Sequence, residues 1–344
     1  MSAEAPTARA QARAIAGHAS TVLVGQLAVM AFGVVDTVVA GRYSTEALAA
    51  LSVGASIYIS VYVSLLGVVQ ALLPIYAEHR GAGRLLEVGR AFRQALYLSF
   101  VLIALGVLAL LFPGPLLRWA QVPATLLDDV HHYLAVLALA FAPAIWVRMY
   151  SSLSQAMGKP WLVTALQVLG LAVKIPLSIG FTFGAFGFSG LGVVGCAWAT
   201  LVVNLLMFAC AAVLLRRAEV FRAAQVWARL EPVQWGQLRS FARLGVPGGL
   251  AVMIEVTSFT LMAVFIARLG AAASASHQIA SSVTAVLYML PLSMGLAASA
   301  RTSWHLGAGS AVLASHAVYI SIGLLASASI ALAAIIFIAP TAIA

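Results

Sequence analysis

This sequence has few charged residues. Only 8% of its 344 residues are charged, 63% are hydrophobic, and the mean hydropathy is +1.04. A soluble domain carries about 25% charged residues, which solvate its surface. The composition therefore excludes a soluble globular protein and predicts a chain that uses lipid as part of its solvent.

Other absences narrow the class further. The two cysteines, Cys196 and Cys210, lie in one apolar segment without CxxC spacing, which predicts reduced core thiols. No small-residue cleavage site follows a short apolar core near the start, so we expect no cleaved signal peptide. The sequence contains no HExxH motif and no GxSxG motif, and helix-end electrostatics is the preferred account of its Asp/His stretch, DDVHH at 128–132. This argues against an enzyme, a cofactor and a bound metal.

Long apolar segments dominate what is present. Nine of them can each cross about 30 Å of hydrocarbon as a helix. Turn-forming glycine and proline separate several of them, as at 81–83 and 113–115. We therefore predict an all-α polytopic membrane protein. The expected helices cover residues 17–40, 47–76, 91–112, 126–149, 160–183, 190–215, 241–267, 274–299 and 312–339.

The basic residues predict the orientation. With the N-terminus in the cytoplasm, 15 of the 19 Lys and Arg residues lie on cytoplasmic segments, as the positive-inside rule requires. Arg42, Arg118 and Arg268 lie outside, and Lys174 lies within a span. The net charge of +9 thus reflects membrane topology, and its scatter among apolar spans argues against nucleic-acid binding. We expect a multi-pass protein of a bacterial-type inner (plasma) membrane. The fifteen are Arg9, Arg13, Arg80, Arg84, Arg90, Arg93, Arg148, Lys159, Arg216, Arg217, Arg222, Arg229, Arg239, Arg243 and Arg301.

An internal repeat predicts the architecture. A shift of 226 residues lays HRGAG at 79–83 on HLGAG at 305–309, and Arg42 on Arg268. The shift spans six predicted helices, an even number, so both copies keep the same orientation in the membrane. Chance similarity between two Ala/Gly-rich helix pairs is the alternative. Because the matching pentapeptides fall in equivalent loops, the repeat is the preferred interpretation.

The repeat also predicts an incomplete second copy. Residue 344 corresponds to residue 118, which follows the third helix of the first copy. We therefore expect a complete first lobe of six helices and three helices of a second, as in a C-terminally truncated protein. The expected parts are a six-helix bundle at 1–216, an Arg-rich amphipathic cytoplasmic connector at 217–240, and a partial bundle at 241–344.

Three charged residues lie deep in predicted spans, beyond the first and last four residues: Asp36 in the first, Lys174 in the fifth and Glu255 in the seventh. A charge at the bilayer centre costs about 2.5–3.5 kcal/mol on an insertion scale, so such residues usually face a cavity or a partner. Asp36 and Lys174 share the outer half of helices that run the same way, which predicts an ion pair. Titratable acids beside a competing cation suit ion-coupled transport, whereas purely structural ion pairs are the alternative.

Weaker candidates complete the predicted site. His277 and Gln278 open the eighth helix, where they suit a gate or a proton path but also an ordinary interhelical hydrogen bond. Phe259, Tyr288 and Met289 offer aromatic and soft surface to apolar cations, although helix packing explains them as well. Ser178 and Thr200, on the fifth and sixth helices, add hydroxyl oxygens.

Several motifs in order resemble the multidrug and toxic compound extrusion (MATE) family, NorM branch. The resemblance covers essentially the whole chain and is therefore far more specific than any single motif. The matching stretches are VDTVVAG at 35–41, GAG at 81–83, EVT at 255–257, ASHQIA at 275–280 and PLSMG at 291–295.

The resemblance implies two six-helix bundles forming a V around a central cavity. It also implies export of organic, often cationic, compounds, driven by entry of H⁺ or Na⁺ as coupling ion. Asp36 matches the coupling carboxylate of the first lobe, and Glu255 matches an acid of the second. The family often has an NIPLN-like stretch in the fifth helix, where this chain reads KIPLS from Lys174 to Ser178. An ammonium has donors and no lone pair, so we expect H⁺ coupling rather than a sodium site.

We therefore predict a secondary antiporter for small organic molecules that acts as a monomer in the bilayer. One alternative is a flippase for lipid-linked precursors from the same superfamily, which would need a run of cavity-facing arginines. The other is a non-transporting membrane remnant.

Overall fold

The computed structural model describes residues 7–119, 123–184, 190–267 and 271–338, and these residues contain helices and no strand. The all-α prediction is confirmed. The helices are α1 (Ala8–Tyr43), α2 (Thr45–Gln70), α3 (Leu72–Gly81), α4 (Leu85–Leu111), α5 (Gly114–Trp119), α6 (Ala124–Ala156), α7 (Pro160–Phe183), α8 (Val193–Arg217), α9 (Glu219–Arg222), α10 (Trp235–Ala267), α11 (Ala271–Gly307) and α12 (Ala311–Ile338).

Each of the nine predicted spans corresponds to a long helix. Eight helical segments of the described residues are long and apolar enough to cross a membrane, with α2 and α3 counted as one segment. The ninth predicted span is α10, which has 33 residues. The expected span 47–76 is not one continuous helix, because it breaks at Ala71 between α2 and α3. Pro74 follows in the first turn of α3, where its missing N–H removes a bond to the preceding turn.

The connector predicted at 217–240 contains an irregular segment between α9 and α10. Only the four residues of α9 are helical in its first part, and α10 begins at Trp235, before the predicted 241. Side chains of α4 hold the irregular segment between them. Arg93 donates to Glu231 at 2.7 Å, Gln94 donates to the Pro232 carbonyl at 3.0 Å, and Tyr97 donates to the Glu231 carbonyl at 2.9 Å. The connector is thus fixed to the first lobe by tertiary hydrogen bonds.

The first lobe has one large apolar core and, beside it, a smaller cluster of Val147, Val203 and Met207. Its largest fully buried side chains include Phe141 and Tyr150 of α6 and Tyr76 of α3. Helix α6 packs against α2, α4 and α8, and α7 packs against α1 and α8. Helix α6 is therefore the central helix of this lobe, and the α1–α7–α8 group lies on one side of it.

The repeat is visible in the loops. After α3, the N–H groups of residues 82, 83 and 84 donate to the carbonyls of 78, 80 and 79, and after α11 those of 308, 309 and 310 donate to 304, 306 and 305. Each bond corresponds to its counterpart at the 226-residue shift. Gly83 and Gly309 both have positive φ, 71° and 78°, which only glycine adopts without strain. Arg268, the predicted partner of Arg42, lies outside the described residues.

The two copies meet through equivalent residues. A Cβ on Gly81 would collide with the Trp304 carbonyl oxygen, and a Cβ on Gly307 would collide with the Glu78 carbonyl oxygen. The 226-residue shift converts each of these two contacts into the other. It likewise converts the packing of α2 on α10 into the packing of α11 on α1. Such exchange is what a two-fold axis between the copies produces.

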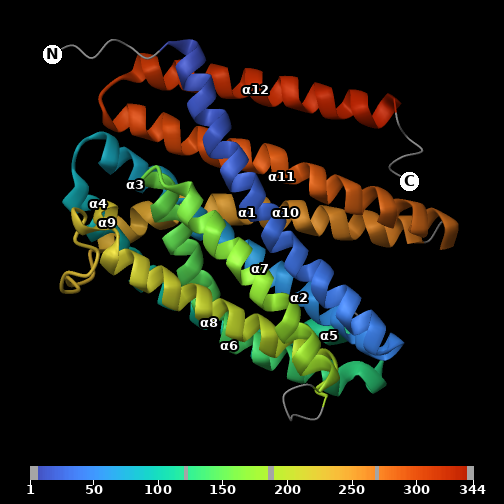
Figure 1. The fold of residues 1–344 in the computed structure, drawn as a ribbon. Coiled ribbons are helices and arrows are strands. Elements are labelled where there is room, and N and C mark those ends of the chain that lie inside the picture. Colours follow the sequence, from blue (N-terminus) through green and yellow to red (C-terminus); the bar gives the residue numbers. More distant parts are fainter. Residues whose placement is uncertain (1–6, 120–122, 185–189, 268–270, 339–344) are drawn as a thin grey trace.

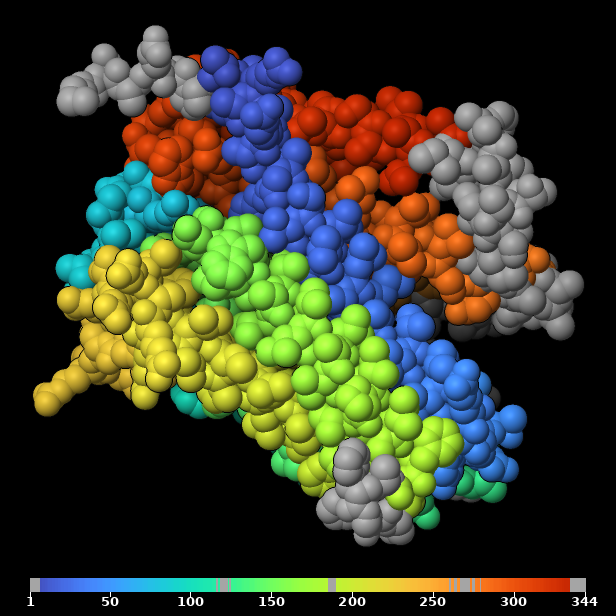
Figure 2. Space-filling model, viewed as in Figure 1, coloured from blue at the N-terminus to red at the C-terminus, as the bar shows by residue number. Residues whose placement is uncertain are grey.

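The lobes converge at one end of the molecule, which we call the paired-loop end (residues 81–84 and 307–310). In Figure 1, α11 and α12 cross the N-terminal half of α1, and α6, α7 and α8 form a second group on the opposite side of the molecule from α12. Figure 2 shows the two groups in contact at the paired-loop end and diverging toward the end where α1 finishes. The arrangement is a V with its closed end at the paired loops.

Candidate ion-coupling site

Asp36 and Lys174 form an ion pair between α1 and α7. The Lys174 Nζ atom lies 2.8 Å from Oδ1 and 2.8 Å from Oδ2 of Asp36. Lys174 has no solvent-exposed surface, and Asp36 is 7% exposed. The pair predicted from their shared depth is therefore present, buried between two helices that pack along their length.

The ammonium of Lys174 has an acceptor for each of its three protons. Besides the carboxylate, it donates to the Cys196 carbonyl at 3.2 Å and to the hydroxyl of Thr200, both on α8. The Thr200 hydroxyl in turn donates to the Cys196 carbonyl at 2.9 Å. Two helices, α1 and α8, thus supply the acceptors around a cation carried by a third, α7.

The carboxylate of Asp36 has further support from α7. The Ser178 hydroxyl, one turn beyond Lys174, donates to Oδ1 of Asp36 at 3.2 Å. Ser178 is fully buried. Asp36, Lys174, Ser178 and Thr200 therefore form one cluster, which we call the Asp36–Lys174 cluster. All four were candidates from the sequence.

Burial determines the energetics of this cluster. Two charges taken out of water are tolerated only when they pair closely and their remaining hydrogen-bond groups are satisfied. Removing one partner from such a pair costs about 3–5 kcal/mol, because an unpaired charge stays buried. The cluster is neutral as a whole, and any change in its protonation leaves a net charge in an apolar bundle.

Sequence reasoning missed two neighbours of this cluster. Cys196 was interpreted only as a core thiol, yet its backbone carbonyl accepts from Lys174. No residue type marks such a carbonyl in a sequence. Tyr133 of α6 is buried, its ring fills the space beside Gly54, and it lies near enough to Asp36 to interact electrostatically. A tyrosine amid apolar residues of a span was the available signal.

Glu255 lies in a different environment on α10. Its side chain is half-buried and accepts a hydrogen bond of 3.3 Å from the hydroxyl of Tyr288. Tyr288 is an exposed residue of α11. Phe259 is also exposed, one turn further along α10, and Met289 is half-buried beside Tyr288 in sequence. No ion pair in the described part of the chain involves Glu255.

The remaining candidates are not joined to either acid by hydrogen bonds of the described residues. His277 is half-buried and lies 3.2 Å from the Ser281 hydroxyl, one turn along the same helix. Gln278 is exposed, and its carbonyl accepts from Ser282. Contacts within α11 therefore account for the positions of both His277 and Gln278.

A metal centre is not assembled from the described residues, since no three His, Cys, Asp or Glu side chains cluster there. The arrangement instead offers two distinct electrostatic features. One is a closed, charge-balanced cluster in the first lobe, and the other is an open carboxylate with aromatic neighbours in the second. The first suits exchange of a proton, and the second suits contact with an organic cation.

Comparison with known proteins shows what the chain as a whole is similar to. A family model described as MatE matches residues 22–180 and 247–344, which is most of the chain. Among curated proteins, a probable multidrug resistance protein NorM of Aromatoleum aromaticum is 39% identical over 81% of the chain and 60% of its own length. The corresponding NorM of Chromobacterium violaceum is 38% identical over 87% of the chain and 65% of its own length.

Longer alignments and solved structures agree with this similarity. A multidrug resistance protein MdtK of Proteus mirabilis is 31% identical over 95% of the chain and 72% of its own length. The Vibrio cholerae MATE transporter VcmN in its bent form superposes with a TM-score of 0.86 at 20% identity, covering 97% of this chain and 75% of that one. The eukaryotic MATE transporter AtDTX14 gives 0.86 at 20% identity, covering 96% and 73%. The chain thus spans 60–65% of the length of the two NorM relatives.

Proposed function

The chain belongs to the MatE family of membrane transporters, and from this premise we propose that it exports organic, often cationic, molecules in exchange for protons. The names of its relatives, multidrug resistance proteins, support this substrate class. The single observation that carries the proposed proton coupling is the buried, fully hydrogen-bonded pair of Asp36 and Lys174.

The pair links protonation to conformation. When a proton reaches Asp36 from the outside, the carboxylate becomes neutral and the Lys174 ammonium is left buried without a counter-charge. That state is costly in an apolar bundle, so a conformation that gives the ammonium water or another partner becomes favoured. A proton therefore shifts the equilibrium between two arrangements of the lobe, which is what coupling requires.

Sodium is the less favoured coupling ion. A sodium site needs several oxygen ligands, and both carboxylate oxygens of Asp36 already accept from Lys174. Lys174 itself offers only donors. Replacing it with asparagine would return an amide oxygen to this position, and we expect that Lys174→Asn introduces sodium dependence.

The open acid of the second lobe suits the substrate. Glu255 with the phenol of Tyr288 and the ring of Phe259 presents a negative charge beside aromatic faces on α10 and α11. An organic cation gains from both contacts. Met289 adds an adaptable apolar surface to this group. We assign this face to substrate contact and the Asp36–Lys174 cluster to the proton.

The proposal also includes topology. We place the protein in the inner membrane as a monomer, with the N-terminus and the paired-loop end on the cytoplasmic side, where the positive-inside count puts them. The V described above then opens outward. A flippase for lipid-linked precursors is disfavoured, because Lys174, which lies within a span of the first lobe, is already neutralised by Asp36.

Drug accumulation tests the function in cells. The chain, expressed from its own gene in bacteria that lack their own efflux pumps, should lower the accumulation of ethidium. Asp36→Asn should abolish this effect at equal membrane abundance, whereas Glu46→Gln, a change at the start of α2, should leave it intact. Equal ethidium levels with and without the unmutated chain would favour the membrane-remnant alternative.

A further inference from the structure

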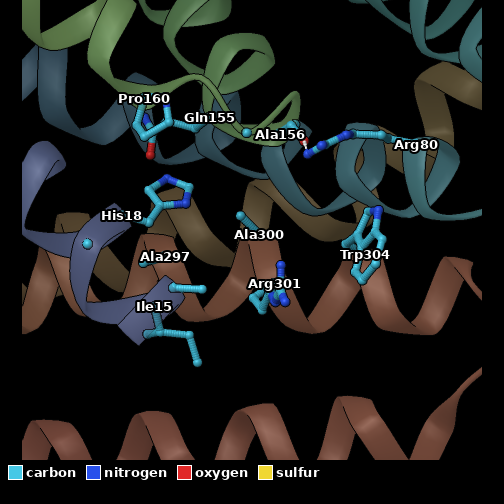
Figure 3. A pocket seen from close by; sticks show the side chains of 13 residues that line it. Ile15, His18, Arg80, Gln155, Ala156, Pro160, Ala297, Ala300, Arg301 and Trp304 are labelled. Carbon is cyan, nitrogen blue, oxygen red and sulfur yellow. Dashed lines mark hydrogen bonds between the residues drawn. The ribbon is translucent and has the colours of Figure 1, made fainter. Parts of the chain in front are cut away.

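A polar cavity lies at the paired-loop end, apart from the Asp36–Lys174 cluster. Its volume is about 380 Å³. Helices α1, α3, α6 and α7 of the first lobe line it on one side, and α11 of the second lobe lines it on the other (Figure 3). The polar residues that line it are His18, Arg80, Gln155 and Arg301.

This cavity carries positive charge without a counter-ion. Arg80 comes from the first lobe and Arg301 from the second, and the two repel each other electrostatically. None of the lining residues is acidic, and neither arginine forms an ion pair among the described residues. Two guanidinium groups on opposite sides of the contact between the lobes weaken that contact unless an anion lies between them.

The arginines are held in place by their surroundings. Arg80 donates to the Ala156 carbonyl at 2.9 Å, and its guanidinium lies against Gly158, where any Cβ would displace it. Arg301 stacks over the ring of Trp304 at 5.1 Å from its centre. Figure 3 shows Arg301 on α11 and Arg80 on the side of the cavity formed by the first lobe. The two groups are thus positioned on facing walls.

Several buried polar atoms in this cavity have no hydrogen-bond partner among the described residues. They are Nε2 of His18, Oε1 of Gln155 and Nε of Arg301. The amide nitrogen of Gln155 donates to the Ser151 hydroxyl. The amide oxygen of Gln155 is free and can accept a hydrogen bond from His18 when Nε2 of His18 carries the proton. The free donor that remains is Nε of Arg301. An unsatisfied buried donor indicates a missing acceptor.

We propose that this cavity binds a phosphate-type oxyanion that joins the two lobes. Planar guanidinium groups match the geometry of phosphate oxygens and bind them in a bidentate manner. The phosphate belongs either to a lipid headgroup or to free inorganic phosphate. Bound between Arg80 and Arg301, it replaces a repulsion across the lobe contact with two attractions. It therefore stabilises the closed state of the paired-loop end.

Binding to the purified 344-residue chain tests this proposal. The thermal unfolding midpoint would be measured in phosphatidylcholine nanodiscs with inorganic phosphate or chloride at equal ionic strength, and again in phosphatidylglycerol nanodiscs. Retained lipid would be counted by native mass spectrometry. Stabilisation by inorganic phosphate identifies the free anion as the ligand. Retention of phosphatidylglycerol without a phosphate effect identifies the lipid headgroup.

Variants separate this site from general attraction to anions. Arg80→Gln and Arg301→Gln should each weaken binding by about tenfold, the value of roughly one charge-assisted hydrogen bond. Arg84→Gln removes an exposed arginine of the adjoining loop and should change nothing. If the glutamine variants do not fold, Arg80→Lys and Arg301→Lys keep the charge and should show intermediate affinity. No stabilisation by either probe, or an equal loss in Arg84→Gln, would overturn the proposal.

Discussion

The two lobes treat an intramembrane acid in opposite ways. Asp36 in the first lobe is buried, paired with an ammonium and supported by a hydroxyl from α7. Glu255 in the second lobe is half-buried and accepts from one exposed phenol. Although the lobes repeat at 226 residues, the shift lays Asp36 on Met262 and Glu255 on Val29. The repeat therefore conserves the loops and the packing, whereas the acids are specific to each lobe.

The difference shows what burial demands of a charge. A half-buried carboxylate can keep water as a partner, so one hydrogen bond suffices. A buried carboxylate and a buried ammonium need each other and further polar groups. The stability of the first lobe should thus depend on its acid, whereas that of the second should not.

Removal of the buried acid should have the largest effect. Asp36→Asn leaves the Lys174 ammonium buried without a counter-charge, and we expect a loss of about 3–5 kcal/mol. The thermal unfolding midpoint of the purified chain measures it. Glu255→Gln is the matched control and should shift the midpoint far less. Equal shifts for the two variants would contradict the comparison.

Removal of both charges should recover most of that loss. A buried ion pair replaced by uncharged groups of similar size is often neutral or stabilising, so Asp36→Asn combined with Lys174→Met should unfold near the wild-type midpoint. Proton-driven transport should stay absent, because no group is left to carry the proton. A double variant as unstable as Asp36→Asn alone would show that the pair contributes more than charge balance.

Loss of a supporting hydroxyl should cost less. Ser178→Ala removes the hydrogen bond to Asp36, and Thr200→Val removes the one from Lys174 together with the one to the Cys196 carbonyl. We expect about 1–3 kcal/mol for a buried group left unsatisfied. Thr200→Ser keeps the hydroxyl and serves as the control. A midpoint for Thr200→Ser as low as that of Thr200→Val would point to lost packing rather than to the hydrogen bond.

A third carboxylate, Glu231 of the connector, tests the intermediate case of a pair at the surface. Burial acts to raise the pKa of Glu231, but the hydrogen bond from Arg93 and the charges of Arg93 and Arg90 hold it below its ordinary value. The stabilisation of the folded chain by ionised Glu231 is therefore present at neutral pH and is lost as the pH falls through that lowered pKa. Because 28% of the Glu231 side chain is exposed, we expect this ion pair to contribute less than about 1 kcal/mol to the free energy of unfolding.

Titration of stability checks this contribution. The difference in unfolding midpoint between the unmutated chain and Glu231→Gln should be constant near pH 7 and shrink toward zero in acid. Glu219→Gln, in the same connector and outside this network, should show no such dependence. A difference that grows as the pH falls would have the wrong sign for the proposed pair.

Much of the fold and part of the site could be predicted from the sequence. The nine spans and the loop repeat follow from apolar length and from glycines whose positive φ leaves few substitutes. The Asp36–Lys174 pair follows from two charges at one depth, because an unpaired charge there is costly. Local signals of composition and spacing were sufficient for each of these features.

The rest depends on contacts between distant segments. Fixation of the connector by Arg93 and Gln94 joins residues far apart in the sequence that no local pattern connects. The Cys196 carbonyl is a backbone atom that every residue carries. The break at Ala71 had a visible cause in Pro74, but a proline in a membrane helix can also be accommodated without a break.

Transport by the purified chain in proteoliposomes tests the central claim most directly. Ethidium movement would be recorded with a pH gradient at equal sodium on both sides, and then with a sodium gradient at fixed pH. We predict transport under the pH gradient alone, and its loss in Asp36→Asn. Transport that follows the sodium gradient at fixed pH, or that survives in Asp36→Asn, would contradict proton coupling through the Asp36–Lys174 pair.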